Sequence, residues 1–189
     1  MRVIRTIIFL LVCLGLIWLV VILFRQVFTS GNQTTPVATS KLSSYARVGT
    51  SAQLFLDGPV VANQDHRSVR ISVDSSQSKI EVISGYDGSV LQQEAFPNTQ
   101  ESYSVFLRSL DTLGFSKVNT KTIQDERGQC PLQSRYVYLL TDGSKQVIRS
   151  WSTSCGTGSM GGVRSSVRSL FIRQIPPKTF ASMTNNLAL

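Results

Sequence analysis

The glycine-rich segment after Cys155 carries the clearest ligand-binding pattern in this chain of 189 residues. Gly156, Gly158 and Gly161 form a G-x-G-x-x-G pattern between a β-prone run and a helical run. Such glycines let backbone N–H groups approach a phosphate at a helix N-terminus. A dinucleotide site also needs an acidic residue about 20 positions further on. Asp142 is the last acidic residue of the chain, so we expect no nucleotide cofactor.

A narrower anion-binding role remains for the same segment. Arg164 and Arg168 lie one turn apart at the start of a helix expected over 163–174, where backbone N–H groups are free. With the three glycines they form a candidate site for a phosphate, a sulfate or a carboxylate. The alternative is a flexible connection whose arginines are solvated, and the sequence leaves both interpretations open.

Few residues of the chain fit a catalytic site. His66 is the only histidine, and a Ser-His-Asp triad would depend on it. Its polar neighbours, from Asn63 to Arg67, predict an exposed turn instead. The chain has no C-x-x-C or H-E-x-x-H motif, so we expect no zinc site. Carboxylate pairs of the glycosidase kind can come from anywhere in a fold, so a hydrolase that uses carboxylates remains an alternative.

Cys130 and Cys155 are the two cysteines outside the apolar N-terminal run, and we expect a disulfide between them. Asp142-Gly143 suits a two-residue hairpin turn between the β-prone runs 135–140 and 146–151. In the register that this turn sets, the two cysteines lie opposite each other. The same register groups the cysteines with Leu132, Tyr136, Tyr138, Leu140, Val147 and Trp151 on the expected core face.

The other elements indicate an α+β fold. Strands are expected over 69–73, 79–83 and 90–96, with a shorter edge strand over 52–56. A strict turn at Asp87-Gly88 would oppose Glu81 to Glu94, so we expect a bulge or a longer loop there. Asn98 and Glu101 form a capping-box pattern before a helix that ends at Gly114. Two helices on one antiparallel sheet, with a hairpin disulfide, are the predicted fold, and a ββα-ββα order is one option for it.

The N-terminal run Thr6–Phe24 is apolar and uncharged, and as a helix it would extend about 28 Å, close to the thickness of a bilayer core. Arg2 and Arg5 precede it, which favours a cytoplasmic N-terminus. The alternative is a cleaved signal peptide, although the run is longer than an ordinary h-region and no Ala-x-Ala follows it. Cys13 lies within this run.

These features divide the chain into five segments. They are a cytoplasmic N-terminus (1–5), a single-pass transmembrane signal-anchor helix (6–25), a polar stalk (26–48), an extracytoplasmic α+β domain (49–178) and a flexible tail (179–189). The chain has 19 Lys and Arg against 11 Asp and Glu. Six basic residues and no acidic ones follow Asp142: Lys145, Arg149, Arg164, Arg168, Arg173 and Lys178.

A basic end outside the cytoplasm suits an anionic partner, and it suits a solvated surface without a partner equally well. We therefore expect a membrane-anchored binding or interaction domain of the cell envelope rather than an enzyme, without a cofactor or a metal. Its expected partners are the lipid bilayer, through residues 6–25, and an envelope protein or an anionic polymer. The alternatives are the hydrolase above and a structural subunit of a membrane assembly.

Overall fold

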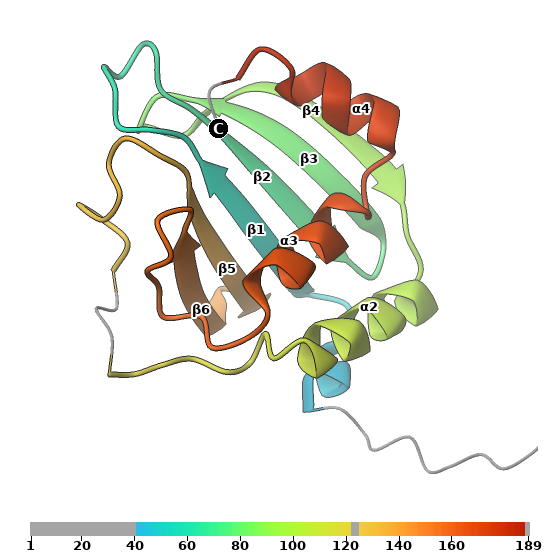
Figure 1. Ribbon diagram of the computed structural model, residues 1–189. Helices are drawn as coiled ribbons and strands as arrows, with labels where there is room; N and C mark the ends of the chain where they lie inside the picture. Colours follow the sequence, from blue (N-terminus) through green and yellow to red (C-terminus); the bar gives the residue numbers. More distant parts are fainter. Residues whose placement is uncertain (1–40, 122–124, 188–189) are drawn as a thin grey trace, which may run out of the picture. The chain divides into compact units, whose positions relative to one another are not determined.

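Six antiparallel strands form one sheet in the described part of the chain (Figure 1). The structure is a computed structural model that describes residues 41–121 and 125–187. The strands are β1 (Thr50–Asp57), β2 (Arg67–Asp74), β3 (Gln77–Ser84), β4 (Ser89–Pro97), β5 (Arg135–Asp142) and β6 (Lys145–Thr153). They lie in the order β4-β3-β2-β1-β5-β6. The predicted antiparallel α+β sheet is therefore confirmed.

The described residues contain three α-helices, one more than predicted: α2 (Gln100–Thr112), α3 (Arg164–Ile172) and α4 (Pro177–Thr184). Helix α4 begins at Pro177 and buries Met183, so this part of the predicted tail is helical and packed. A short 3-10 helix, η1 (Lys41–Tyr45), packs on α2 through the buried Leu42. The folded unit thus begins before residue 49.

The ββα-ββα order is wrong. Four strands precede α2, and β5, β6, α3 and α4 follow it. The run 52–56 was expected at an edge, but β1 is a central strand that pairs with both β2 and β5. Its buried residues Ala52, Leu54 and Leu56 alternate with partly exposed ones, so that one face of the sheet lies against the helices in Figure 1.

A bulge in the β3–β4 hairpin confirms the expected irregularity. The register shifts between Val82 and Ile83, which places Glu81 opposite Gln93 and separates Glu81 from Glu94. The following helix is capped one residue later than predicted. Thr99 is the N-cap of α2 and accepts a hydrogen bond from the Ser102 N–H at 3.1 Å.

The predicted disulfide Cys130–Cys155 is confirmed, but the register that led to it is wrong. Val137 pairs with Trp151 rather than with Ile148. The register of this hairpin also shifts between Leu140 and Thr141. Both cysteines lie beyond the paired strands, with Cα atoms 6.1 Å apart. Trp151 consequently lies on the face opposite Tyr138, although the predicted register puts both on one face.

No helix within residues 41–121 and 125–187 combines the length and the apolar character needed to cross a bilayer. The predicted span over 6–25 lies outside the described residues.

Candidate functional site

The glycine-rich segment follows β6 and lies along its outer edge. The N–H of Thr153 donates to the Thr157 carbonyl at 2.9 Å, and the N–H of Met160 donates to the Trp151 carbonyl at 3.0 Å. The Trp151 N–H donates to Ser159 Oγ at 3.1 Å. Gly158 forms an isolated bridge with Ser152. This stretch, residues 156–160, is called the edge loop below, and it occupies the hydrogen-bonding groups at the end of β6.

Two of the three glycines are needed for close packing. Gly158 has φ +150°, and a Cβ there would lie 2.6 Å from Ser152 Cα. A Cβ at Gly161 would lie 3.1 Å from the Lys117 carbonyl oxygen, which accepts the Gly161 N–H at 2.8 Å. Both glycines therefore let one backbone segment approach another, without any ligand.

The Arg164 guanidinium turns back onto the edge loop. Its Nη1 donates to the Gly156 carbonyl at 2.6 Å, and longer contacts of 3.4–3.5 Å reach the carbonyls of Thr157, Gly158 and Met160. A cation among carbonyl oxygens stabilises the loop. Arg164 is thus in part a structural residue, which the sequence did not indicate.

Arg168 lies one turn further along α3 and takes a different position. Its guanidinium carbon lies 4.7 Å from the centre of the Tyr136 ring, a cation–π contact. Arg164 and Arg168 both line a small pocket of about 150 Å³ beside Tyr136 and Tyr138. Burial raises the pKa of the Tyr138 hydroxyl, which lies 3.2 Å from Ser152 Oγ, so this tyrosine stays neutral.

A larger pocket of about 490 Å³ gathers most of the predicted anion site. Its lining is polar apart from one aromatic ring, and it consists of Asn119, Lys121, Gln129, Trp151, Gly156, Thr157, Gly158 and Arg164. We call it the loop pocket. It joins Gly156, Gly158 and Arg164 to Lys121, whereas Gly161 and Arg168 lie outside its lining. None of the described residues that line it is acidic.

Sequence reasoning missed Lys121 and Trp151 because long-range pairing brings them to this pocket. Val118 forms a bridge with Met160, and the Asn119 N–H donates to the Ser159 carbonyl at 2.7 Å. These contacts hold the segment before Lys121 against the edge loop. The apolar character of Trp151 indicated burial only.

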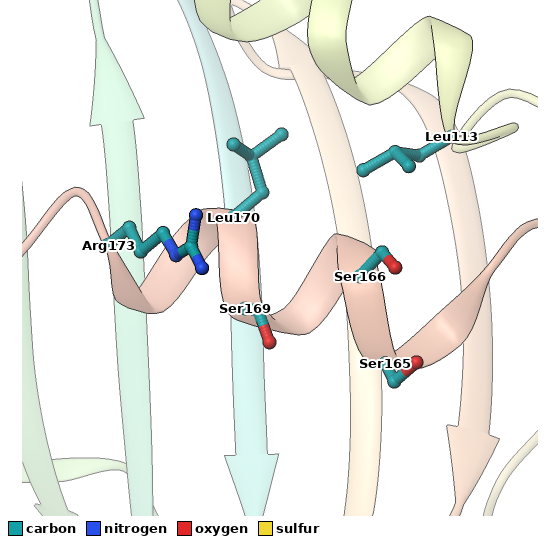
Figure 2. A pocket seen from close by; sticks show the side chains of 6 residues that line it. All are labelled: Leu113, Ser165, Ser166, Ser169, Leu170 and Arg173. Atoms are coloured by element: carbon teal, nitrogen blue, oxygen red, sulfur yellow. The ribbon is translucent and has the colours of Figure 1, made fainter.

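A third pocket, of about 340 Å³, lies between the end of α2 and the outer surface of α3 (Figure 2). Its lining consists of Leu113, Ser165, Ser166, Ser169, Leu170 and Arg173. Val163, the N-cap residue, makes no side-chain capping bond. The region offers hydroxyl groups and one cation but nothing that fixes a ligand on several sides.

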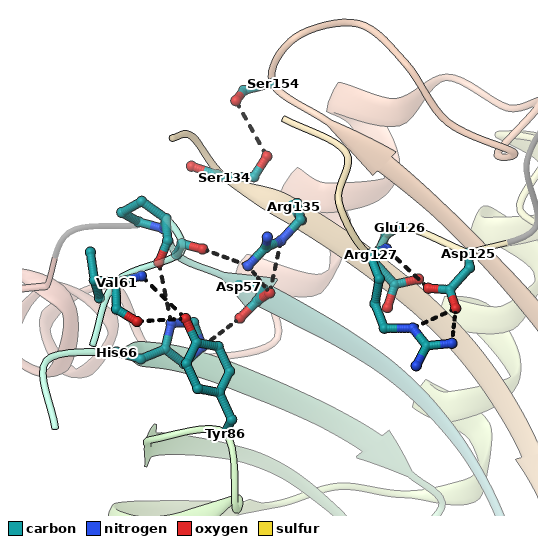
Figure 3. A network of polar contacts seen from close by, with 12 residues as sticks. Asp57, Val61, His66, Tyr86, Asp125, Glu126, Arg127, Ser134, Arg135 and Ser154 are labelled. Carbon is teal, nitrogen blue, oxygen red and sulfur yellow. Dashed lines mark hydrogen bonds and ion pairs between the residues drawn. The ribbon is translucent and has the colours of Figure 1, made fainter. Parts of the chain in front are cut away.

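A buried ion cluster lies at the end of the sheet where β1 ends and β5 begins (Figure 3). The Asp57 carboxylate binds His66 Nε2 at 2.9 Å through Oδ1 and Arg135 Nε at 2.9 Å through Oδ2. His66 also stacks on Tyr86, with ring centres 4.0 Å apart. The expectation of an exposed histidine is wrong, since only 3% of His66 is exposed.

Two carboxylates share a shallow pocket of about 280 Å³ on the face of the sheet opposite the helices. Asp57 and Glu126 both contribute to its lining. Asp57 is bound by His66 and Arg135, and Glu126 forms an ion pair with Arg149. An arginine pairs with each carboxylate, Arg135 with Asp57 and Arg149 with Glu126. This arrangement is typical of structural ion pairs and not of the opposed acid and base of a glycosidase.

The described residues contain no group of three or more His, Cys, Asp or Glu side chains that could hold a metal ion. Comparisons of the chain with protein-family models and with curated protein sequences find no match. The loop pocket is therefore the candidate binding site on its geometry alone.

Proposed function

We propose that this chain is a single-pass, membrane-anchored domain of the cell envelope that binds an anionic partner in the loop pocket. The partner is an anionic polymer or an acidic segment of an envelope protein. The observation that supports the binding role is the composition of the loop pocket, which joins Lys121 and Arg164 to hydrogen-bonding groups without a described acidic residue. Unopposed positive charge in a concave site attracts anions and raises their rate of association.

Two further observations support the location outside the cytoplasm. Disulfides persist mainly in oxidising compartments, and Cys130 and Cys155 are bonded. The apolar run Thr6–Phe24 has the length of a transmembrane helix. The two carboxylates Asp57 and Glu126 support the alternative of a hydrolase less well, because cations bind both of them.

Trp151 offers a direct test of binding. The chain has two tryptophans, so Trp18→Phe leaves Trp151 as the only indole reporter. The full-length chain in detergent micelles would be titrated with poly-L-glutamate and with polyphosphate while its fluorescence is followed. We expect saturable binding that disappears in about 1 M NaCl, where the Debye length falls to about 3 Å.

Charge reversal locates the contact. Lys121→Glu should weaken binding of both polyanions, because Lys121 lines the loop pocket. Lys145→Glu is the matched control, since this exposed lysine lies roughly 20 Å away along β6. Reversing Arg164 and Arg168 together should also weaken binding, but this change disturbs the edge loop as well. Equal binding by wild type, Lys121→Glu and Lys145→Glu would contradict the proposal.

The location has its own test in intact cells. A membrane-impermeant maleimide should label Cys130 and Cys155 only after a reductant is added, because both thiols are bonded outside the cytoplasm. Labelling without reductant, or a full-length product found free in the cytosol, would contradict the membrane-anchored location while leaving the binding test unaffected.

A further inference from the structure

The two edges of the sheet differ in what the described chain does with them. At one edge the edge loop bonds to Trp151, Ser152 and Thr153 of β6. At the other edge β4 pairs with β3 only, and no described residue outside β3 pairs with it (Figure 1). An unpaired edge presents a row of backbone N–H and C=O groups that can bind another strand.

Strand β4 is long and exposed over almost its whole length. It has nine residues, and all except Phe96 are exposed. Leu91 is 59% exposed and Val90 45%. Folded proteins usually protect such an edge with charged side chains (above all lysine), an internal proline, a bulge or a covering segment. Strand β4 has one charge, Glu94, and one bulge, at Leu91, but it has no lysine and its proline is the last residue, Pro97. The regular stretch 92–95 therefore carries a single charge as its protection.

We propose that β4 pairs with β4 of a second copy of this chain, which joins two six-stranded sheets into one across a two-fold axis. Antiparallel pairing of a strand with its own copy is isologous and therefore closes at two subunits. At the β6 edge the edge loop occupies the hydrogen-bonding groups of residues 151–153. The rest of β6 carries Lys145 and Arg149, and charged side chains oppose the addition of another strand. This leaves β4 as the pairing edge in the described part of the chain. The product is a dimer and not a fibre.

Geometry and charge select the register. Side chains alternate between the faces of a sheet, and opposed residues share a face. A two-fold axis perpendicular to the sheet therefore places one residue opposite its own copy, and the register is named below by that residue. An axis at Glu94 would place two carboxylates opposite each other, which is unfavourable. An axis at Gln92 would place the bulged residue Leu91 inside the pairing, since the regular β3–β4 pairs run from Gln92 to Pro97.

An axis at Ala95 would place Glu94 opposite the apolar Phe96, which offers its carboxylate no donor. An axis at Gln93 opposes no two carboxylates and centres the pairing on the regular residues Gln92, Gln93 and Glu94, so that Leu91 meets Ala95 only at its ends. It places Gln93 opposite its own copy and Gln92 opposite Glu94. The Gln92 amide can then donate to the Glu94 carboxylate of the other copy, once on each side of the axis. This register gives each Glu94 carboxylate a hydrogen-bond donor and needs no change in the fold of either copy.

Cysteine crosslinking in the full-length chain tests the register. In a Cys13→Ala background, Gln93→Cys should form a disulfide-linked dimer under mild oxidation, because opposed Cα atoms in an antiparallel pair lie about 4.5–5.5 Å apart. Gln92→Cys is the matched control. Its two copies would be offset by two residues along the strand, beyond about 7 Å, and should not crosslink.

Sedimentation in density-matched detergent tests the dimer itself. Wild type should be a dimer, and Gln93→Lys should raise the dissociation constant about tenfold or more, because two like charges then meet on the axis. Val105→Lys, at an exposed position on α2, should remain a dimer. Unchanged thermal melting of these variants would show that the fold is intact.

Three results would overturn the proposal. The first is a monomeric wild type at every concentration measured. The second is crosslinking of Gln92→Cys as efficient as that of Gln93→Cys. The third is a Gln93→Cys variant that crosslinks in membranes to a different protein, which would assign the β4 edge to a strand of another partner.

Discussion

Asp57 binds two buried side chains at the end of the sheet, the His66 imidazole and the Arg135 guanidinium. Besides the bonds of its carboxylate to His66 and Arg135, Arg135 Nη2 donates to the Gly58 carbonyl at 3.0 Å, and His66 Nδ1 lies 3.3 Å from the Pro59 carbonyl oxygen. The cluster therefore fixes the chain that leaves β1. Its role is structural, because each charged group in it already has a partner inside the fold.

Removing Asp57 should be strongly destabilising. Asp57→Ala leaves the Arg135 side chain, which is 5% exposed, without its carboxylate. The loss of one partner of a buried ion pair costs about 3–5 kcal/mol of unfolding free energy. Urea unfolding followed by circular dichroism measures this change.

Asp125→Ala is the control for this prediction. Asp125 also pairs with an arginine, but the Arg127 side chain is 87% exposed. Water can solvate Arg127 after the change, so the urea midpoint should stay where it is. Equal losses in the Asp57 and Asp125 variants would contradict the structural importance of the cluster.

Glu81 makes the stability of the sheet depend on pH. Arg70 Nε donates to Glu81 Oε2 at 2.6 Å, and Lys79 Nζ donates to Glu81 Oε1 at 3.0 Å. Burial by itself raises the pKa of Glu81, but the hydrogen bonds and charges of Arg70 and Lys79 together outweigh burial. They hold this pKa below its ordinary value of 4.5.

The sign of the effect follows from proton binding. The folded state binds the Glu81 proton more weakly than the unfolded chain does, so stability from Glu81 is present above pH 4.5 and is lost as the pH falls through the lower folded-state pKa. Between about pH 5 and pH 3, the unfolding free energy of wild type should therefore fall more steeply than that of Glu81→Gln. The Asp65→Asn variant, which changes an exposed carboxylate in a turn, should follow wild type. Parallel curves for wild type and Glu81→Gln would contradict the prediction.

At the scale of elements, the sequence located strands and helices better than it located their registers. The spacing of Tyr103, Phe106, Leu107 and Leu110 predicted the buried face of α2 correctly. Strand registers depend on turns and bulges, and a single extra residue moves side chains to the other face. In the β5–β6 hairpin the loop residues are Gly143 and Ser144, one position beyond the expected Asp142-Gly143.

The edge loop depends on glycine in two distinguishable ways. Gly156→Ala places a side chain at φ +90° with nothing within 4 Å of its Cβ, so only backbone strain opposes it, about 1–2 kcal/mol. Gly158→Ala adds a clash with Ser152 Cα and the Trp151 carbonyl, about 1–3 kcal/mol more. The difference between the two urea midpoints measures the contact of the loop with β6.

This comparison also tests how the β6 edge is protected. If the edge loop leaves β6 in Gly158→Ala, that edge opens and the variant should aggregate in light scattering at concentrations where Gly156→Ala stays clear. Identical behaviour of the two variants would show that the close approach of Gly158 to β6 contributes nothing to the free energy of unfolding.

At the scale of the whole molecule, the candidate site could be predicted in part. The glycines and Arg164 were found from local spacing, and Gly156, Gly158 and Arg164 do line one pocket. Lys121 enters this pocket through backbone pairs between the segment 118–119 and residues 159–160, a contact without a local signal. His66 was misassigned for the same reason, because Asp57, Pro59 and Tyr86 surround it only in the folded chain.

The disulfide joins the segment that precedes β5 to the residue that precedes the edge loop. The positions of both segments depend on contacts between residues distant in sequence. Cys130 and Cys155 are 25 residues apart in sequence. Closing a loop of this length in the unfolded chain corresponds to about 3.5 kcal/mol of stability. We therefore expect the Cys130→Ser, Cys155→Ser double variant to lose about this much unfolding free energy.

Loss of the disulfide should also weaken backbone hydrogen bonds next to it. The Val60 N–H donates to the Pro131 carbonyl at 2.7 Å, and the Ser154 N–H donates to the Ser134 carbonyl at 3.0 Å. Both amides should exchange faster with deuterium in the double variant, whereas the β2–β3 amides should change only by the global loss of stability. Reductant should destabilise wild type and leave the double variant unaffected, with Cys13→Ala behaving as wild type. A double variant as stable as wild type, with both amides still protected, would show that noncovalent packing alone holds the edge loop and the 130–134 segment in place.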